Sequence, residues 1–300
     1  MNTILKFWFI IFIVVTFDLL FEYLFGINFL GNKSNYPNRL AGFTGDELKI
    51  GGFYFGFILL SLTYIKYNKS NWFIFFLIAF FVTAYLIGER SNFIKIFLMI
   101  LPFYFILYNS NVFKKIFYLS IPIIIILLIT ITDAKFKHRF FYYFLNPIIK
   151  NNLEESLSKD KHISHYRLAI DIFKNNKLFG VGIKNFRHES IKEKYNNLNY
   201  KSSNARQATH PHQIHLEFLS ETGIFGYFCF LIFILFLLKI SLKNYFKNRN
   251  IFQLSSIIFV LSSLLPFLPS GSFLSTFNSG IFWVNFAIML GFCKISKKSL

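Results

Sequence analysis

Residues 217–238, EFLSETGIFGYFCFLIFILFLL, decide the class of fold. Beyond Glu221 this stretch contains no charged residue, and as a helix it is long enough to cross a hydrocarbon layer of roughly 30 Å. Such a run predicts a membrane-spanning helix. The sequence therefore predicts an all-α, polytopic membrane helix bundle of about eight spans, because seven further runs are also mostly apolar: 4–25, 50–67, 71–88, 93–108, 112–132, 251–268 and 273–292.

The composition excludes a soluble domain. Hydrophobic residues make up 54% of the chain and charged residues 15%, whereas soluble domains contain about 25% charged residues. The formal charge of +18 does not indicate nucleic-acid binding, because many of the basic residues lie in the short loops between apolar runs. Cys229 and Cys293 fall inside two runs, which favours apolar packing over a disulfide or a metal site.

Lysine and arginine in short loops predict the orientation, because such residues are retained on the cytoplasmic side. With the N-terminus inside, the cytoplasmic segments carry no acidic residue. The first run continues without a cleavage pattern, so we expect it to remain as a span. Both termini are predicted to be cytoplasmic, since the basic residues of these segments are Lys6, Lys66, Lys69, Lys114, Lys115, Lys239, Lys243, Lys247, Arg249, Lys294, Lys297 and Lys298.

The long segment 133–213 is predicted to lie outside the cytoplasm. It holds 15 of the 32 Lys and Arg residues and six of the seven histidines, and His215 follows it directly. We expect three regions: an N-terminal membrane bundle of about five spans (1–132), an extracytoplasmic loop (133–213), and a C-terminal bundle of about three spans (214–300). Any chemistry is expected on the extracytoplasmic side.

Three outward-facing stretches each contain an arginine that orientation does not explain. Arg39 lies in NRLAGFTGDELKIGG (38–52), where glycines and an acidic pair indicate a tight turn before a helix. Arg90 lies in GERSNF (88–93), where it is either a snorkelling anchor paired with Glu89 or a functional group. Either arginine could bind an anion.

The third stretch, SHYRLAIDIFKNNKLFGVGIKNF (164–186), predicts an amphipathic helix at the membrane face. Ser164 is expected to cap it, Leu168, Ile172 and Phe173 to form its apolar stripe, and the Asn-Asn pair at 175–176 to end it. Arg167 in its first turn is either a solvated surface residue or an anion-binding group.

The segment HPHQIHLEFLSETG (210–223) precedes the uncharged run. His210, His212 and His215 could ligate zinc with a carboxylate, but their spacing fits no familiar zinc motif and Pro211 hampers a helical pair. They could also form a polar helix entrance without chemistry. The third interpretation is a general base or a hydrogen-bonding group, for which imidazole is suited near neutral pH.

Together these stretches resemble the O-antigen polymerase and O-antigen ligase family of bacterial envelope glycosyltransferases. The resemblance rests on RLAGFTGDE (39–47), ERSNF (89–93), YRLAIDIFKNNKLFGVGIKNF (166–186) and HPHQIHLEFLSETGIFG (210–226), in family order and over nearly the whole chain. It implies a GT-C-like membrane fold in the bacterial inner membrane. The chain has fewer predicted spans than is usual in that family, and Gln213 replaces the asparagine of its His-Asn motif.

The resemblance also implies a reaction: transfer of a glycan from undecaprenyl diphosphate to an acceptor hydroxyl at the periplasmic face, with no metal and no cofactor. The acceptor is either a lipid-linked glycan or a lipid A core. By the matching motifs, Arg90, Arg167 and His212 are the expected catalytic residues. Arg90 and Arg167 are also expected to bind substrate, together with Arg39, His210 and His215.

Two other functions are compatible with the same residues. A transporter or flippase of lipid-linked oligosaccharides would bind the diphosphate at external arginines without breaking a bond, but it should carry ionisable groups within its spans and some repeat symmetry. An inactive envelope assembly protein would keep the bundle without needing His212. The expected partners of the enzyme are a lipid-linked donor, a glycan or lipid A core acceptor and membrane lipids, and no nucleic acid.

Overall fold

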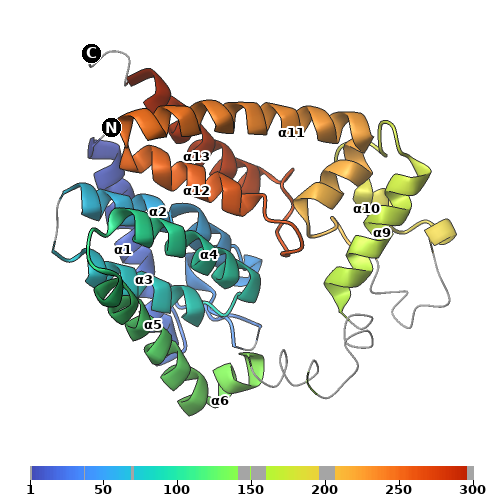
Figure 1. Ribbon diagram of the computed structural model, residues 1–300. Coiled ribbons are helices and arrows are strands. Elements are labelled where there is room, and N and C mark those ends of the chain that lie inside the picture. The colour runs from blue at the N-terminus through green and yellow to red at the C-terminus, as the bar shows by residue number, and fades with distance from the viewer. Residues whose placement is uncertain are drawn as a thin grey trace. The chain divides into compact units, whose positions relative to one another are not determined.

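The computed structural model describes residues 2–36, 38–68, 71–140, 149, 160–195 and 207–295. Over these residues the chain is helical and forms no strand. The order of elements is shown in Figure 1: α1 (Asn2–Phe25), η1 (Gly42–Glu47), α2 (Ile50–Tyr67), α3 (Phe73–Leu86), α4 (Arg90–Leu107), α5 (Val112–Thr132), α6 (Ala134–Phe136), α9 (Lys161–Asn175), α10 (Phe186–Glu189), η3 (Glu193–Tyr195), α11 (Ile214–Asn248), α12 (Ile251–Ser263) and α13 (Thr276–Ile295).

The chain divides into two compact units. Unit 1 comprises Met1–Phe144, Asn244–Ser263 and Val284–Leu300, and unit 2 comprises Leu145–Lys243 and Leu264–Trp283. Each unit is described by itself below.

Every predicted span corresponds to an apolar helix, and α2 and α5 begin and end at the predicted residues. Six helices in the described part of the chain are long and apolar enough to cross a membrane: α1, α2, α4, α5, α11 and α13. The other two, α3 and α12, have only 14 and 13 residues. Helix α3 stops shortly before Gly88, whose φ of 77° leaves the helical region, and α12 stops before Pro266.

Helix α2 is the core of unit 1. It packs against α1, α3, α4 and α12 (Figure 1). Its Tyr54, Ile58 and Leu62 are fully buried, and the ring of Phe57 stacks on Trp8 of α1 with 4.3 Å between centroids. Aromatic side chains therefore supply much of the apolar packing between these helices.

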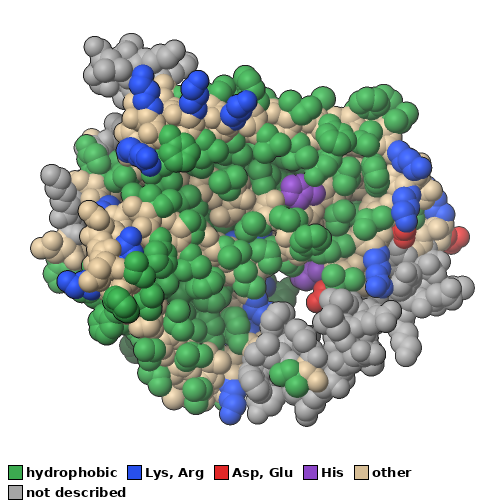
Figure 2. Space-filling view, in the orientation of Figure 1, with side chains coloured by type: hydrophobic (Ala, Val, Ile, Leu, Met, Phe, Trp, Pro, Cys, Tyr) green, Lys and Arg blue, Asp and Glu red, His purple; other side chains and the backbone are tan. Residues whose placement is uncertain are grey.

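Helix α5 shows that this fold needs a lipid environment. It packs against α3, yet Phe113, Phe117 and Ile131 along its 21 residues are at least 62% exposed. Figure 2 shows hydrophobic side chains over much of the visible face, and on α11 Ile232 and Phe236 are at least 61% exposed. A water-soluble protein rarely exposes so continuous an apolar surface, so these faces are expected to contact lipid.

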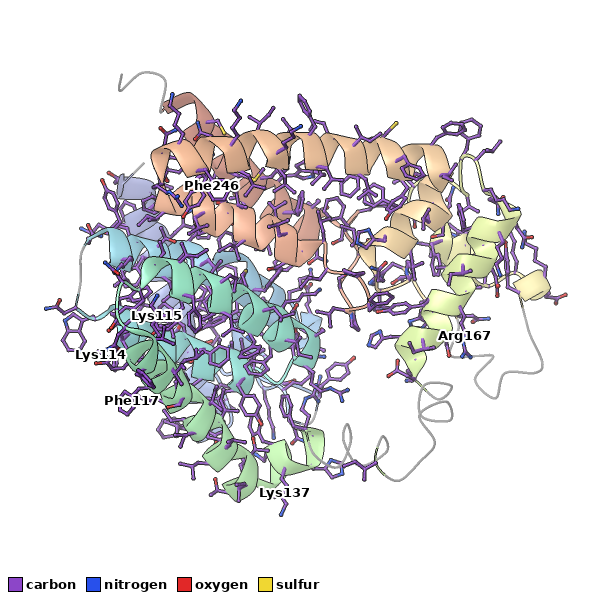
Figure 3. All side chains as sticks on the ribbon, in the orientation of Figure 1. Lys114, Lys115, Phe117, Lys137, Arg167 and Phe246 are labelled. Carbon is purple, nitrogen blue, oxygen red and sulfur yellow. The ribbon has the colours of Figure 1, made fainter. Side chains whose placement is uncertain are left out.

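Basic side chains gather at one end of unit 1. Lys66, at the end of α2, lies 6.0 Å from the ring centroid of Tyr108, which follows α4. Lys115, at the start of α5, donates a hydrogen bond to the carbonyl of Phe105 (2.8 Å). Figure 3 shows Lys114 and Lys115 at this end of α5 and Lys137 beyond its opposite end. The ends of α2 and α4 and the start of α5, which were all predicted to be cytoplasmic, thus lie together.

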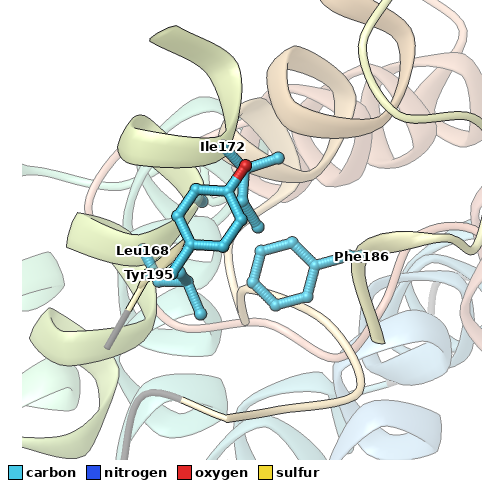
Figure 4. Close-up of a cluster of buried hydrophobic side chains, with 5 residues drawn as sticks. Leu168, Ile172, Phe186 and Tyr195 are labelled. Atoms are coloured by element: carbon cyan, nitrogen blue, oxygen red, sulfur yellow. The ribbon is translucent and has the colours of Figure 1, made fainter. Parts of the chain in front are cut away.

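In unit 2, α9 packs its apolar side against the segments that follow it. Leu168, Ala169 and Ile172 are buried against Phe186 of α10 and Tyr195 of η3 (Figure 4). The stripe predicted on this helix therefore faces a protein core, with Phe173 only partly buried.

The predicted N-cap of α9 is wrong. The helix begins at Lys161, and the carboxylate of Asp160 accepts hydrogen bonds from the amides of His162 and Ile163. Ser164 lies inside the first turns and is buried. Aspartate is as good an N-cap as serine, and the earlier start brings His162 into the helix as well. The end at Asn175 is confirmed.

Candidate functional site

The site region of unit 2 is built around a break in α11. Gly223 has φ 66° and ψ −168°, which interrupts the helix between its polar first turns and its apolar run. The segment 177–182 crosses this break. The amides of Val181 and Gly182 donate to the carbonyls of Ser220 and Glu221 (3.0 and 2.8 Å). In return, the amide of Ile224 donates to the carbonyl of Lys177 (2.8 Å).

Two glycines allow this close backbone contact. A Cβ added to Gly223 would lie 2.3 Å from the carbonyl oxygen of Leu178, and one added to Gly180 would lie 2.4 Å from the carbonyl carbon of Glu221. In the sequence these glycines stand in LFGVGIKNF (178–186) and SETGIFG (220–226). The structure shows why the GVG segment and the ETG segment belong together.

Polar side chains fix the entrance of α11. The side chain of Gln213 accepts a hydrogen bond from the amide of Leu216 (2.7 Å) and so caps the helix. The carboxylate of Glu217 accepts from the hydroxyl of Ser272 and from the amide of Phe273. The carboxylate of Glu221 accepts from the amides of Lys184 and Phe186. The carboxylates of Glu217 and Glu221 thus hold the segments 272–273 and 184–186 against the first turns of α11.

His212 lies in a cluster of four imidazoles. Its ring centroid is 4.0 Å from that of His210 and 5.1 Å from those of both His162 and His165 on α9. His212 itself has a φ of 57°, and its carbonyl accepts a hydrogen bond from the amide of Ser270 (2.8 Å). We call His162, His165, His210 and His212 the histidine cluster.

Burial keeps two members of the cluster neutral. It lowers the pKa of His210 to about 4, with further lowering by His165, Arg187 and His162. Burial lowers the pKa of His212 to about 3, and its three neighbouring histidines act in the same direction. In the described part of the chain, no group of three or more His, Cys, Asp or Glu residues is arranged to hold a metal ion.

We expect unit 2 to lose stability in acid because of this cluster. The unfolded chain binds protons at the ordinary histidine pKa of 6.5, whereas folded His210 and His212 resist protonation. As the pH falls from 6.5 toward 4, the unfolded state therefore gains protons first and the melting temperature should drop. Thermal unfolding in detergent at several pH values measures this. The variant His210→Gln should weaken the dependence of the melting temperature on pH. The variant His188→Gln, at an exposed histidine, should leave that dependence unchanged.

His215 has a different environment from His212. Its Nε2 lies 2.9 Å from the carbonyl oxygen of Leu264, and its Nδ1 lies 3.0 Å from the hydroxyl of Tyr227. Both ring nitrogens thus make contacts within the protein. This geometry orients the first turn of α11, and the substrate-binding role expected for His215 remains a prediction.

Arg167 is partly buried on α9, two residues after His165 (Figure 3). Arg187 of α10 is close enough to lower the pKa of His210. The sequence did not single out Arg187, His162 or His165. The signal available in the sequence was a pair of histidines three residues apart in KHISHYR (161–167).

In unit 1, Arg39 and Glu89 form an ion pair. Arg39 donates to one carboxylate oxygen of Glu89, and the side-chain amide of Asn92 donates to the other. Arg139 donates to the carbonyl of Gly88 (2.6 Å). Burial raises the pKa of Glu89, an effect that Arg39 opposes. Arg90 follows directly as the first residue of α4.

The Arg39–Glu89 pair should be strongly coupled. Only 9% of the Glu89 side chain is exposed, so Arg39→Met leaves a buried carboxylate without its cation and should cost about 3 kcal/mol. The double variant with Glu89→Leu should recover much of that loss. Lys49→Met provides the control, because the Lys49–Glu47 pair is exposed and its loss should cost less than about 1 kcal/mol. Additive effects of the Arg39 and Glu89 variants would contradict the coupling.

Residues 73–231 match the sequence profile of the O-antigen ligase family. The match covers more than half of the chain. The chain belongs to the O-antigen ligase family. Among curated proteins, none matches it.

Membership of the O-antigen ligase family identifies a glycosyltransferase-like enzyme of the O-antigen ligase and polymerase type in a membrane. The matched region contains Arg90, Arg167 and His212, together with the histidine cluster and the break at Gly223. Arg39 precedes it. The family assignment thus confirms the resemblance on which these residues were selected, and their individual roles remain predictions.

Proposed function

We propose that the protein transfers a glycan from undecaprenyl diphosphate to an acceptor hydroxyl at the periplasmic face of the bacterial inner membrane. The acceptor is a lipid-linked glycan or a lipid A core. The observation that carries the proposal is the position of His212: it lies in a partly buried imidazole cluster within the region that matches the O-antigen ligase family.

The proposed mechanism assigns one role to each group. The imidazole of His212 accepts the proton of the acceptor hydroxyl, and a neutral imidazole is the form able to do so. The oxygen then attacks the anomeric carbon as the bond to the diphosphate breaks. Arg90 and Arg167 bind the diphosphate through charge-assisted hydrogen bonds that strengthen as its negative charge grows, so we propose that no metal ion is needed.

Attack opposite the departing diphosphate predicts inversion at the anomeric carbon. Nuclear magnetic resonance of the product linkage, compared with that of the donor, measures this. A product that keeps the donor's anomeric configuration would overturn the single-displacement mechanism.

Removing either arginine should reduce transfer by about tenfold to a hundredfold, the effect of losing one or two hydrogen bonds to a charged group. Arg167→Lys should recover only part of the loss, because lysine cannot form a paired contact with phosphate oxygens. Initial rates with a lipid-linked donor test this. Lys174→Ala, at an exposed cation near the end of α9, provides the control. Equal rates for Arg167→Ala and Lys174→Ala would remove Arg167 from the mechanism.

The proposal is tested with the purified full-length protein, a lipid-linked donor and each acceptor in turn. Released undecaprenyl diphosphate together with a lengthened glycan identifies a polymerase, and release with a modified lipid A core identifies a ligase. Complementation of a host that lacks its own polymerase or ligase gives the same distinction in cells. A donor that stays intact with both acceptors would refute the proposed reaction.

A further inference from the structure

The histidine cluster contains more ionisable groups than one general base requires. His162 and His165 come from α9, and His210 and His212 come from the segment before α11. The ring centroid of His212 lies 4.0 to 5.1 Å from those of the other three histidines, and the centroids of His162 and His165 are 6.2 Å apart. Two segments distant in sequence therefore place three imidazoles around that of His212.

The charged groups that lower the pKa values of His210 and His212 are basic. The carboxylate of Asp160 lies at the start of α9, where it accepts a hydrogen bond from the amide of His162 (2.7 Å). His210 is influenced by His165, His162 and the guanidinium of Arg187. Its Nδ1 lies 2.9 Å from the hydroxyl of Thr209, and its Nε2 is buried without a hydrogen-bond partner among the described residues. From the loop after α12, the amide of Ser270 contacts only the carbonyl of His212.

Without a bound anion, such a cluster of imidazoles resists protonation. Imidazolium ions at 4 to 6 Å repel one another, and burial removes the water that would screen them. The four histidines must therefore titrate as a coupled group, in which one proton opposes the binding of the next. A bound anion has the opposite effect on protonation. It attracts a proton to the cluster and offsets the repulsion between that proton and the neighbouring positive charges.

We propose that His162, His165, His210 and His212 form one site for the phosphate groups of the lipid-linked donor, and that this anion binds together with about one proton. The identity of the anion rests on the proposed function. The coupling itself rests on the geometry of the cluster and requires no turnover.

The cluster also suits the charge changes of the reaction. Transfer removes one proton from the acceptor hydroxyl and leaves one additional negative charge on the departing diphosphate. The proton taken up with the donor rests on another member of the cluster, so that His212 stays neutral and accepts the proton of the acceptor hydroxyl. The cluster then holds two protons next to the additional negative charge of the diphosphate. Both protons leave to solvent when the diphosphate departs, so that protons and electrons balance.

The test measures binding of a short-chain polyprenyl diphosphoryl monosaccharide to the full-length protein in phosphatidylcholine nanodiscs. The phosphates of this probe stay ionised between pH 5.5 and 7.5, so any proton taken up comes to rest on the protein. Isothermal titration calorimetry in two buffers with different protonation enthalpies counts those protons. We expect uptake of about one proton near pH 6 and an affinity that tightens about tenfold per unit decrease in pH.

Variants locate the proton. His162→Gln combined with His165→Gln and His210→Gln should abolish uptake and make the affinity independent of pH, whereas His188→Gln should change neither. If the triple variant does not fold, the single variant His210→Gln is measured instead, and it should reduce proton uptake in part. Binding by the wild-type protein without proton uptake would overturn the proposal, whatever the variants show.

Two further outcomes separate the alternatives. Equal proton uptake on adding phosphatidylglycerol, with no probe present, would assign the site to phospholipid headgroups and overturn the donor assignment. Transfer activity is measured separately. Proton-coupled binding in a protein that transfers nothing would refute the proposed function alone, and transfer without proton uptake would refute this inference alone.

Discussion

His212→Gly is expected to lower kcat for glycan transfer by about 10²- to 10⁴-fold, the usual contribution of a general base. Glycine is the informative substitution because His212 has a φ of 57°, a conformation that glycine adopts without strain. The variant thus removes the imidazole while keeping the backbone and its hydrogen bond from Ser270. Alanine would keep the Cβ that makes this conformation costly while removing the contacts of the imidazole.

Initial rates at matched membrane levels measure the effect, with His188→Gly as the control at an exposed histidine. Added imidazole should restore part of the lost rate in His212→Gly if the missing group is a proton acceptor. A folding role alone would show as loss of protein without rescue. A wild-type rate in His212→Gly would exclude His212 as the base.

Gly223→Ala is expected to destabilise unit 2 by at least about 2 kcal/mol and to abolish transfer. A non-glycine residue with a positive φ costs roughly 1–2 kcal/mol, and here the new Cβ would also lie 2.3 Å from the carbonyl oxygen of Leu178. Because that obstacle is backbone, the whole segment 177–182 would have to move. Its hydrogen bonds to the break in α11 would weaken as a result.

Thermal unfolding in detergent, followed by circular dichroism, measures this loss. Gly280→Ala is the matched control: Gly280 lies inside α13, and a Cβ added there meets nothing within 4 Å. We expect Gly280→Ala to be neutral or stabilising, as usual for glycine replaced in a helix. Equal melting temperatures for Gly223→Ala and wild type would show that the close contact at Gly223 is not maintained.

The helices could be predicted from the sequence because apolar runs and helix breakers are local signals. Helices α2 and α5 have the predicted bounds, and Asn175 ends α9 as expected. The predicted start of α9 was wrong because Asp160 and Ser164 are both suitable caps, and no local signal in the sequence selects between them. Helix α3 is shorter than its apolar run because it ends near Gly88, and the conformation of that glycine cannot be read from hydrophobicity.

The contacts within the candidate site could not be predicted in the same way. His162 and His210 are 48 positions apart in sequence, and no periodic pattern reports that both enter the same cluster. The pairing of Glu89 with Arg39 depends likewise on the turn that brings residues 38–40 to the start of α4. The family resemblance selected His212 and Arg167, but their surroundings required the fold.

The break at Gly223 has a consequence for biosynthesis. An interrupted helix leaves carbonyls of its first part and amides of its second part unpaired, which is costly next to hydrocarbon. Here Val181 and Gly182 donate to the carbonyls of Ser220 and Glu221, and the carbonyls of Lys177 and Leu178 accept from the amides of Ile224 and Phe225. Because residues 177–182 precede α11 in the chain, the ribosome makes the segment that completes this helix before the helix that needs it.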